Sequence, residues 1–457
     1  MATEQDRATR RGEEILAVFQ TAFGELLAAD PAAFRVKFRK MAASAFAFYR
    51  GTACLFYNDL AAGPDGAVGA TGAAGDDGGA YLDERTSRVW VHGDLHAENF
   101  GTYMDANGRL VFNVNDFDEA YVGPFTWDLK RFAASIALIG YSKALSDEQI
   151  GELVGVYAAA YRARVHDLAT GAKDDEVPPF TLDTAEGPLL GALRDARART
   201  RFALLDSMTE IRDHERRFSA GGGTIELDAA DRYKVLAAFD GYLETLPESS
   251  LARPDSYRVK DVVGRRGIGI GSAGLPSYNI LLEGNSDALE NDVVIYMKRA
   301  QTPAVSRHIT DRAVRDYFEH EGHRTVISQR ALQAHADPWL GWTELEGDGN
   351  RWGQLVAEVS PYAVDLDWSD IDDPAEIAAV VADLGRATAA MHAAADDQSG
   401  HSLVPFSTER AIDAVIAADE DGFAELLTGF AHSYGARARA DHQIFVDLFR
   451  NGRIPGL

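Results

Sequence analysis

Residues 88–120 carry the sequence RVWVHGDLHAENFGTYMDANGRLVFNVNDFDEA, and this stretch decides the fold. The apolar run at 89–91 gives way to a polar loop, and residues 100–104 and 110–114 then flank a turn at 105–108. This pattern predicts a strand, a loop and a β-hairpin. Because a hairpin brings its two ends together, we expect Asp94, Asn99 and Asp116 to converge although they are separated in the sequence.

Three oxygen donors at one point suit Mg²⁺, which binds to a few protein groups, to waters and to substrate phosphates. In kinases, an Asp accepts the proton of the substrate hydroxyl, an Asn five residues later binds metal, and a following Asp-Phe segment also binds metal. Here Asn99 lies five residues after Asp94, and Asp116 precedes Phe117. The pattern predicts Asp94 as the base and Asn99 and Asp116 as metal ligands, with Asp118 as a further candidate.

Two other interpretations of this stretch stay open. His92, Asp94 and His96 form an H-x-D-x-H pattern that suits zinc or iron in a metal-dependent hydrolase, although the chain has no second histidine cluster to complete such a site. The residues could also be a turn cap and a polar strand end without a catalytic role.

A second group of residues is rich in glycine and lies near residue 270. Pro276 and the apolar run up to Leu282 favour a strand after the glycines, whereas a dinucleotide-binding motif would open a helix. A glycine loop between strands lets backbone amides approach the phosphates of ATP, and the next strand ends in Lys298, which suits a phosphate contact. A plain glycine hairpin with a solvated lysine is the alternative. The nucleotide-binding candidates are Gly267, Gly269, Gly271, Ser272, Gly274 and Lys298.

The order of these motifs is the reverse of that in ordinary kinases, because the glycine segment follows Asp94. A circular permutation would explain the order, since chain termini often lie close together. We predict an α+β fold with two kinase-like lobes, the helical catalytic lobe first and the β-rich ATP lobe second. The predicted segments are 1–256 (helices, catalytic loop and metal ligand), 257–365 (nucleotide lobe, with a helix over 311–335) and 366–457 (helices completing the first lobe), with a mobile loop at 61–80.

Composition narrows the class of protein. The 457 residues are 46% apolar and 25% charged, which is typical of a globular protein. The net charge of −26 argues against nucleic acid and anionic membranes as partners. Cys54 is the only cysteine, which excludes an intrachain disulfide and a cysteine-rich zinc site. No apolar run reaches the roughly 18 residues that a membrane span needs, so we expect a soluble, cytoplasmic protein.

Several stretches resemble a known family: MAASAFAFYRG (41–51), HGDLHAENFG (92–101), NDFDEA (115–120), GPFTWDLKRFAAS (123–135), GIGSAGLPSYNILLEG (269–284) and MKRA (297–300). The family is the bacterial domain of unknown function 2252, and the resemblance extends from about residue 34 to residue 392. That family is similar to the protein-kinase-like and aminoglycoside-phosphotransferase superfamily. The resemblance implies a kinase-like fold that uses ATP and Mg²⁺, with Asp128 bracing the catalytic loop.

The chain departs from the family where relatives carry a Glu in the helix after the lysine, because Ile327 occupies that position. The ion-pair partner of Lys298 is therefore open, with Glu319 and Glu321 as candidates. Arg50 could contact substrate or the Asp cluster, or form a structural ion pair. Glu358 falls where a kinase hinge would hold adenine.

These observations predict an ATP- and Mg²⁺-dependent phosphotransferase that acts on a hydroxyl of a small molecule. The acidic surface would tolerate a cationic acceptor such as an aminosugar. The alternatives are a pseudokinase or other nucleotide-binding regulatory protein, a protein nucleotidyltransferase, and the metal-dependent hydrolase described above.

Overall fold

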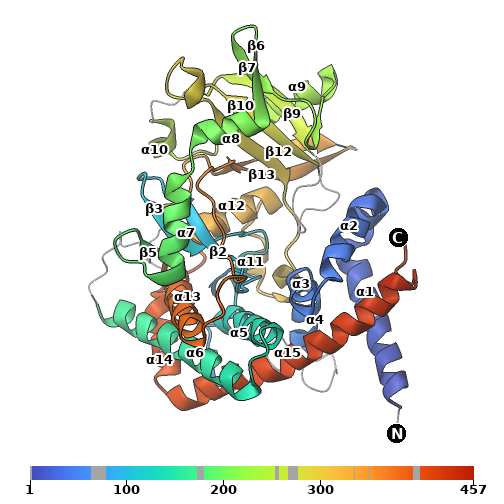
Figure 1. Cartoon of the computed structure of the whole chain (residues 1–457), viewed down its shortest axis with the longest axis vertical. Coiled ribbons are helices and arrows are strands. Elements are labelled where there is room, and N and C mark those ends of the chain that lie inside the picture. Colours follow the sequence, from blue (N-terminus) through green and yellow to red (C-terminus); the bar gives the residue numbers. More distant parts are fainter. Residues whose placement is uncertain are drawn as a thin grey trace.

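The computed structural model describes residues 3–62, 79–171, 180–252, 257–265, 276–333, 335–347, 349–394 and 402–457. A six-stranded sheet lies at one end of the molecule, and helices fill the other end (Figure 1). This mixture of helices and strands confirms the predicted α+β class. The predicted glycine loop falls in 266–275, and most of the predicted loop at 61–80 falls in 63–78, so both lie outside the described residues.

The large sheet is antiparallel, with the strand order β12-β13-β11-β10-β9-β8. Successive residues of its strands face opposite sides: Ile280 and Ile295 join one apolar cluster, and Leu281 and Val294 join another. Its central strands are therefore apolar on both faces. The strands are β8 (Thr224–Ile225), β9 (Val259–Arg265), β10 (Ser277–Leu282), β11 (Val293–Arg299), β12 (Gly341–Gly347) and β13 (Asn350–Glu358).

The segment before residue 253 packs on this sheet. α9 (Ala229–Leu243) contributes Phe239 and Tyr242 to the apolar cluster on one face, and Leu205 and Phe218 lie in the cluster on the other. β8 pairs directly with β9. The predicted segment 1–256 assigned these residues to the helical lobe, whereas they pack on the sheet of the next segment. Helical periodicity does not reveal which core a helix joins. The remaining elements here are α8 (Arg201–Met208), β6 (Thr209–Arg212), β7 (Glu215–Phe218) and α10 (Glu248–Leu251).

The helical part is built around α5 (Phe125–Ser142). Every residue from Phe125 to Gly140 is buried, as expected for a helix that is apolar around most of its circumference. α6 and α15 pack directly on α5, and α13 packs along α6. The surrounding helices are α6 (Asp147–Thr170), α7 (Gly187–Ala198), α13 (Pro374–Ala394), α14 (Thr408–Ile416) and α15 (Glu420–Arg450).

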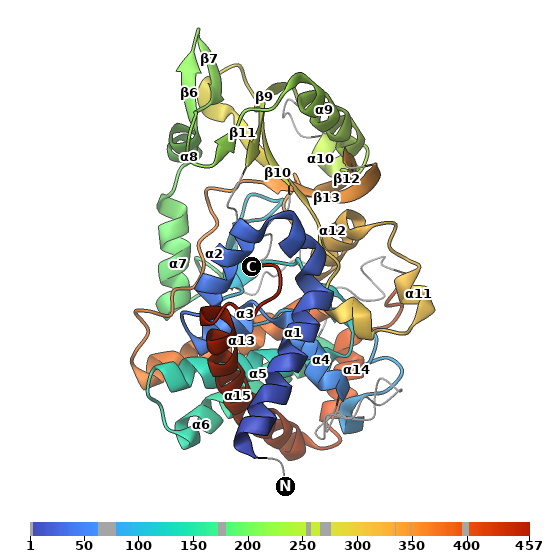
Figure 2. The same cartoon turned by 90° about the vertical axis from the view of Figure 1, so that its right-hand side faces the viewer.

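The first helices of the chain lie against its last long helix (Figure 2). The Arg11 guanidinium donates to Asp59 and to Asp441, each at 2.7 Å through Nη2, and so ties α1 to both α4 and α15. Phe19 also lies against Phe38 and Phe445, with ring centroids 5.7 and 5.9 Å away. These helices are α1 (Glu4–Ala29), α2 (Pro31–Met41), α3 (Ala45–Arg50) and α4 (Ala53–Ala62).

Short strands between the two ends of the molecule carry the segment at 88–120. β2 and β3 form the predicted hairpin, and the Asp105 carboxylate accepts the N–H groups of Asn107 and Arg109 at its turn. β1 pairs with β4, which places the residues after β1 beside those before β4. The strands are β1 (Val89–Val91), β2 (Phe100–Met104), β3 (Leu110–Val114), β4 (Tyr121–Gly123) and β5 (Phe180–Thr181).

The helix predicted over 311–335 is two helices, α11 (Arg312–Arg315) and α12 (Glu321–Leu332). The break occurs because His320 caps α12: its Nδ1 accepts the N–H of His323 at 3.1 Å, in an extended backbone conformation. Short 3₁₀ turns lie at η1 (Gly79–Tyr81), η2 (Leu289–Asn291) and η3 (Val305–His308). Within the ranges described above, no helix has the length and apolarity to cross a bilayer.

Candidate functional site

The loop at 92–99, which connects β1 to β2, is held from behind by α5. Asp128, in the first turn of that helix, accepts the backbone N–H groups of His92 at 2.7 Å and Gly93 at 2.9 Å. Gly93 has a φ of +80°, and a Cβ there would lie 2.1 Å from the carbonyl oxygen of Glu119. Only glycine therefore permits the close approach of this loop to the segment before β4.

Two further buried side chains support Asp128. His392 of α13 lies 3.1 Å from Asp128 through Nε2, and its Nδ1 lies 2.8 Å from the Tyr161 hydroxyl. Asp128 and His392 are both buried. A chain of polar contacts thus runs from α6 through α13 to the backbone of the loop, so that the loop is fixed by groups that no solvent reaches.

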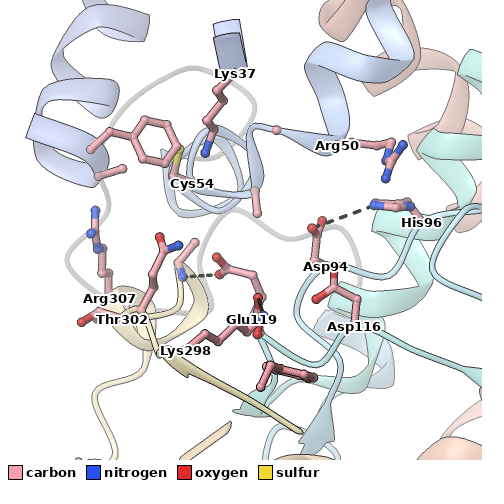
Figure 3. A pocket seen from close by; sticks show the side chains of 18 residues that line it. Lys37, Arg50, Cys54, Asp94, His96, Asp116, Glu119, Lys298, Thr302 and Arg307 are labelled. Carbon is pink, nitrogen blue, oxygen red and sulfur yellow. Dashed lines mark hydrogen bonds and ion pairs between the residues drawn. The ribbon is translucent and has the colours of Figure 1, made fainter. Parts of the chain in front are cut away.

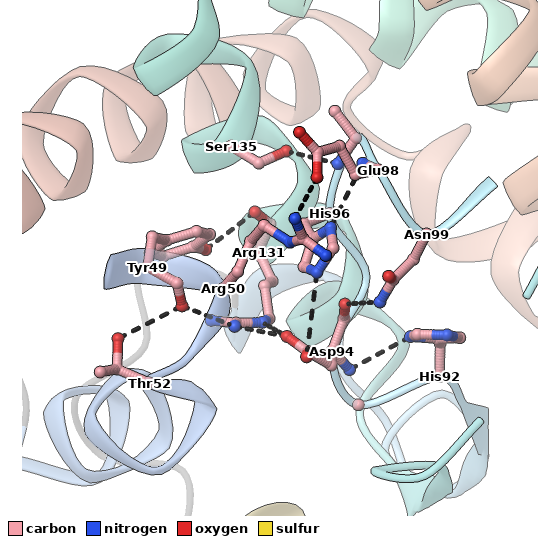
Figure 4. Close-up of polar contacts among 12 residues, drawn as sticks. Tyr49, Arg50, Thr52, His92, Asp94, His96, Glu98, Asn99, Arg131 and Ser135 are labelled. Atoms are coloured by element: carbon pink, nitrogen blue, oxygen red, sulfur yellow. Dashed lines mark hydrogen bonds and ion pairs between the residues drawn. The ribbon is translucent and has the colours of Figure 1, made fainter. Parts of the chain in front are cut away.

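The carboxylate of Asp94 is paired with a buried arginine (Figure 4). Arg131 of α5 donates from Nε to Oδ1 at 2.6 Å, and its guanidinium also lies 4.4 Å from the centre of the Tyr49 ring. Burial raises the pKa of Asp94, and the charge of Arg131 opposes that rise. Asn99 donates from Nδ2 to the Asp94 backbone oxygen at 2.9 Å, so the base and ligand candidates of the first motif are in contact.

The two histidines of the H-x-D-x-H pattern bond to the backbone. His92 contacts the Asn115 carbonyl oxygen at 2.8 Å through Nε2 and accepts the Asp94 N–H at 3.2 Å through Nδ1. His96 accepts the Glu98 N–H through Nδ1, and burial lowers its pKa well below the usual value. Both nitrogens of His92 are therefore occupied. Among the described residues, no cluster of three or more His, Cys, Asp or Glu is arranged to hold a metal ion.

Asp116 begins the segment that follows β3 and has a left-handed backbone, with a φ of +58°. Such a conformation is unusual for a residue other than glycine and is often found at functional sites. Its side chain is exposed to the pocket, while protein surrounds it on the other sides. Desolvation and the neighbouring charge of Asp118 raise the pKa of Asp116 to about 6.

Lys298 connects the large sheet to this segment. It lies near the end of β11, opposite Ser277 of β10 and Leu355 of β13, and donates from Nζ to Asp118 at 2.7 Å. Burial acts to lower the pKa of Lys298, but the charge of Asp118 outweighs it and raises the pKa. The acidic partner of Lys298 is therefore Asp118, and neither Glu319 nor Glu321 of the predicted helix region pairs with it.

Arg324 of α12 adds a second connection. It is buried and donates to the carbonyl oxygens of Asp118 at 2.7 Å, Ala120 at 3.1 Å and Gln301 at 2.6 Å. Glu321 of the same helix pairs with Arg324 at 3.1 Å. The helix after the lysine thus positions the 115–120 segment through an arginine.

The remaining predicted site residues make ion pairs or lie outside the described residues. Arg50 forms an ion pair with Glu98, which makes it a structural partner of the 92–99 loop. The carboxylate of Glu358, at the end of β13, accepts from Arg201 at 2.7 Å, and its N–H donates to Asp337. The glycine candidates and Ser272 lie outside the described residues.

These groups meet in a pocket of about 460 Å³ (Figure 3). Its walls come from α1 to α4, from the loops at 92–99 and 115–120, and from β11 and the residues after it. Residues that line it include Lys37, Asp94, Asp116, Asp118, Lys298 and Arg307. The pocket therefore brings together Asp94, Asp116 and Lys298, which the sequence predicted from separate motifs.

Three buried groups near the pocket were not identified from the sequence. The sequence does contain an indication that Arg131 is buried, because it is a charged residue within an otherwise apolar helix and follows Asp128 by three residues. Lys37 also had a signal, because it follows Phe34 by three residues and precedes Met41 by four, which places it on the apolar face of the helix. Arg324 had none, because its partners are backbone oxygens.

Comparison with known proteins gives one match. The model of the family described as "Uncharacterized protein conserved in bacteria (DUF2252)" matches residues 29–448. No curated protein and no solved structure matches the chain. The matched range contains the loops at 92–99 and 115–120 and the strand that carries Lys298. The chain therefore belongs to the DUF2252 family.

Proposed function

We propose that this protein is an ATP- and Mg²⁺-dependent phosphotransferase that transfers the γ-phosphoryl group to a hydroxyl of a small molecule. The observation that carries the proposal is the contact between Lys298 and Asp118, which are 180 residues apart in the sequence. This contact joins the strand after the glycine segment to the loop with the predicted metal ligand. The two motifs thus form one pocket, as a kinase-type site requires.

The large sheet supports a kinase-like nucleotide lobe. β9 and β10, which flank the glycine-rich segment in sequence, are antiparallel neighbours, and β11 with Lys298 lies next to β10. α12 and the strands β12 and β13 follow. We infer that ATP lies along the end of β9, β10 and β11 with its phosphates directed at Lys298, in a kinase-like fold whose segments are circularly permuted.

The transfer itself would use Asp94. Its Oδ1 is bound to Arg131, so Oδ2 is the oxygen that can accept the proton of an acceptor hydroxyl. The acceptor oxygen forms a bond to the γ-phosphorus as the bond to the β,γ-bridging oxygen breaks, and ADP leaves. The proton passes to Asp94, and Lys298 stabilises charge on the phosphates.

Asp116 and Asn99 fit the ligands of a Mg²⁺ ion bound with the nucleotide. Asp116 is exposed to the pocket. Asn99 is buried, and because its amide nitrogen donates to Asp94, the amide oxygen is the atom that would bind the metal. The backbone N–H of Asn115, which precedes Asp116, donates to the Asn99 carbonyl oxygen at 3.1 Å. Mg²⁺ needs few protein ligands when phosphates and waters supply the rest, and it would neutralise charge on the phosphates.

A nucleotide-binding regulatory protein is the second candidate function. The observation that favours it is the ion pair of Asp94 with the fully buried Arg131, which occupies one of the two carboxylate oxygens that a catalytic base would use. Such a protein would bind ATP through the same pocket without transferring phosphate.

Calorimetric titration with ATP, with and without Mg²⁺, tests the proposal. We expect binding that depends on Mg²⁺ and that Asp116→Ala and Lys298→Ala each weaken at least tenfold. Lys234→Ala removes an exposed lysine of α9 and is the matched control, for which affinity should stay within twofold.

Products then separate the remaining possibilities. Release of ADP with a phosphorylated acceptor supports phosphotransfer, whereas an adenylated protein would indicate nucleotidyl transfer. Binding without turnover for a broad set of acceptors would favour the regulatory protein. If the wild-type protein does not bind ATP at millimolar concentration, both the phosphotransferase and the regulatory protein are contradicted.

A further inference from the structure

Lys37 of α2 is a buried cation that faces the pocket. Its residue is only 5% exposed, and its Nζ lies 4.1 Å from the centre of the Phe23 ring and 5.5 Å from that of Phe34. No described residue lies within hydrogen-bond or ion-pair distance of its ammonium group, and the charges of Glu119 and Asp94 act on it only from farther away. Figure 3 shows the side chain extending from α2 into the pocket, on the side opposite Lys298.

A buried ammonium group without a counter-ion is costly, because it loses hydration and gains no hydrogen-bond acceptor. Desolvation accordingly lowers the pKa of Lys37 to about 8. The two aromatic rings offset only part of this cost. A negatively charged ligand in the pocket would supply the missing partner.

The other cations of the pocket divide into two groups. Lys298 is paired with Asp118, and Arg50 with Glu98. Arg307, which is exposed at the pocket wall, forms no ion pair with any residue that the structure describes. Lys37 and Arg307 are thus the two lining cations whose charge is available to a ligand.

Arg307 lies away from the groups proposed for phosphate transfer, whereas Lys37 is near enough to Asp94 for the charge of that carboxylate to act on it. In Figure 3, Lys37 and Arg307 lie on the α1 and α2 side, and Asp94 and Asp116 on the other. Arg307, Gln301 and Thr302 also line an adjoining pocket of about 860 Å³. A ligand that enters from there would meet Arg307 before it reaches Lys37 and Asp94, which line the inner pocket alone.

We propose that the acceptor carries an anionic group, a phosphate or a carboxylate, which Lys37 and Arg307 bind so that its hydroxyl lies at Asp94. This inference rests on the proposed function. It replaces the cationic acceptor that the acidic composition would tolerate, because the two cations without an ion-pair partner at the pocket wall bear on recognition more directly than the net charge of the protein.

The test uses the full chain saturated with Mg²⁺ and a non-hydrolysable ATP analogue, so that the nucleotide phosphate sites are filled. Inorganic phosphate is titrated by calorimetry as the anionic probe, and methylammonium at equal ionic strength is the cationic probe. We expect phosphate to bind and methylammonium not to bind. Lys37→Met should weaken phosphate binding at least tenfold and Arg307→Gln about threefold. Lys40→Met, an exposed lysine on the same helix, should have no effect.

Lys37→Met keeps the length and burial of the side chain, and its melting temperature shows that it folds. ATP affinity of Lys37→Met should stay within twofold of wild type. The inference is overturned if Lys37→Met binds phosphate as wild type does, if only methylammonium binds, or if Lys37→Met loses ATP as Lys298→Ala does, since Lys37 would then serve the nucleotide.

The two proposals can fail separately. ATP binding with no phosphate binding leaves the phosphotransferase in place and refutes the anionic acceptor. Phosphate binding through Lys37 in a protein that ignores ATP refutes the phosphotransferase and supports the anion site alone.

Discussion

The two loops that meet in the pocket are held in different ways. Residues 92–99 are fixed from the interior of the helical part, by Asp128 behind the backbone and Arg131 on the Asp94 carboxylate. Residues 115–120 are held from the sheet side, by Lys298 and Arg324. The proposed base therefore belongs to a rigid, buried network, while the proposed metal ligand lies at a junction between two parts of the molecule. The first loop thus depends on the helical part for its position, and the second on the contact between the helical part and the sheet.

The strongest way to break the first loop is Arg131→Met. It leaves the Asp94 carboxylate without its counter-ion, and breaking a buried pair in this manner costs about 4 kcal/mol. We expect that loss in the free energy of unfolding, measured by urea denaturation at pH 7. At pH 4 the loss should be smaller, because Asp94 can then become neutral. An equal loss at both pH values would show that Arg131 acts through packing.

Asp128→Ala should have the next largest effect. The change strands the N–H groups of His92 and Gly93 in the interior, and we expect about 3 kcal/mol of lost stability by the same measurement. Asp365→Ala is the control, because Asp365 is exposed and accepts a side-chain hydrogen bond from Asn115. A loss below about 1 kcal/mol for Asp128→Ala would mean that water replaces the carboxylate.

Glu119 lies in the second loop and should make the stability of the protein depend on pH. Burial raises the pKa of Glu119 from its ordinary value of 4.5 to about 7, so the folded protein retains a proton that the unfolded chain releases. The contribution of Glu119 to the free energy of unfolding is greatest below about pH 4.5, where the group is protonated in both states, and it declines as the pH rises toward 7. Glu119→Gln should remove this decline, which we expect to be about 1 to 2 kcal/mol by denaturation between pH 5 and 7.5. If the stability of wild type and Glu119→Gln declined equally with pH, Glu119 would not be the cause of the decline.

Lys298→Met should have the smallest effect on folding. Its ion pair with Asp118 is partly exposed, and such pairs contribute less than about 1 kcal/mol. We nevertheless expect loss of ATP binding, so stability and ligand affinity should separate for this variant. A stability loss above about 2 kcal/mol would place Lys298 in the framework of the site.

The sequence predicted what depends on local pattern. Alternation and turn residues located β1 to β3, and the hairpin then placed Asn99 beside the segment that carries Asp116. What it did not predict depends on long-range packing. The periodicity of α9 is the same whichever core the helix covers, and the periodicity of α2 puts Lys37 on its apolar face without showing that this face borders a pocket. Asp118 became the partner of Lys298 only because two distant segments meet.

The bond between Arg11 and Asp441 has a consequence for synthesis on the ribosome. α1 emerges from the exit tunnel long before α15, so its apolar face must wait for its partner. The wall of the pocket that carries Lys37 and Phe23 can therefore close only late in translation. Nascent chains arrested before Asp441 should expose that face to chaperones, although Asp94 and Lys298 have already been made.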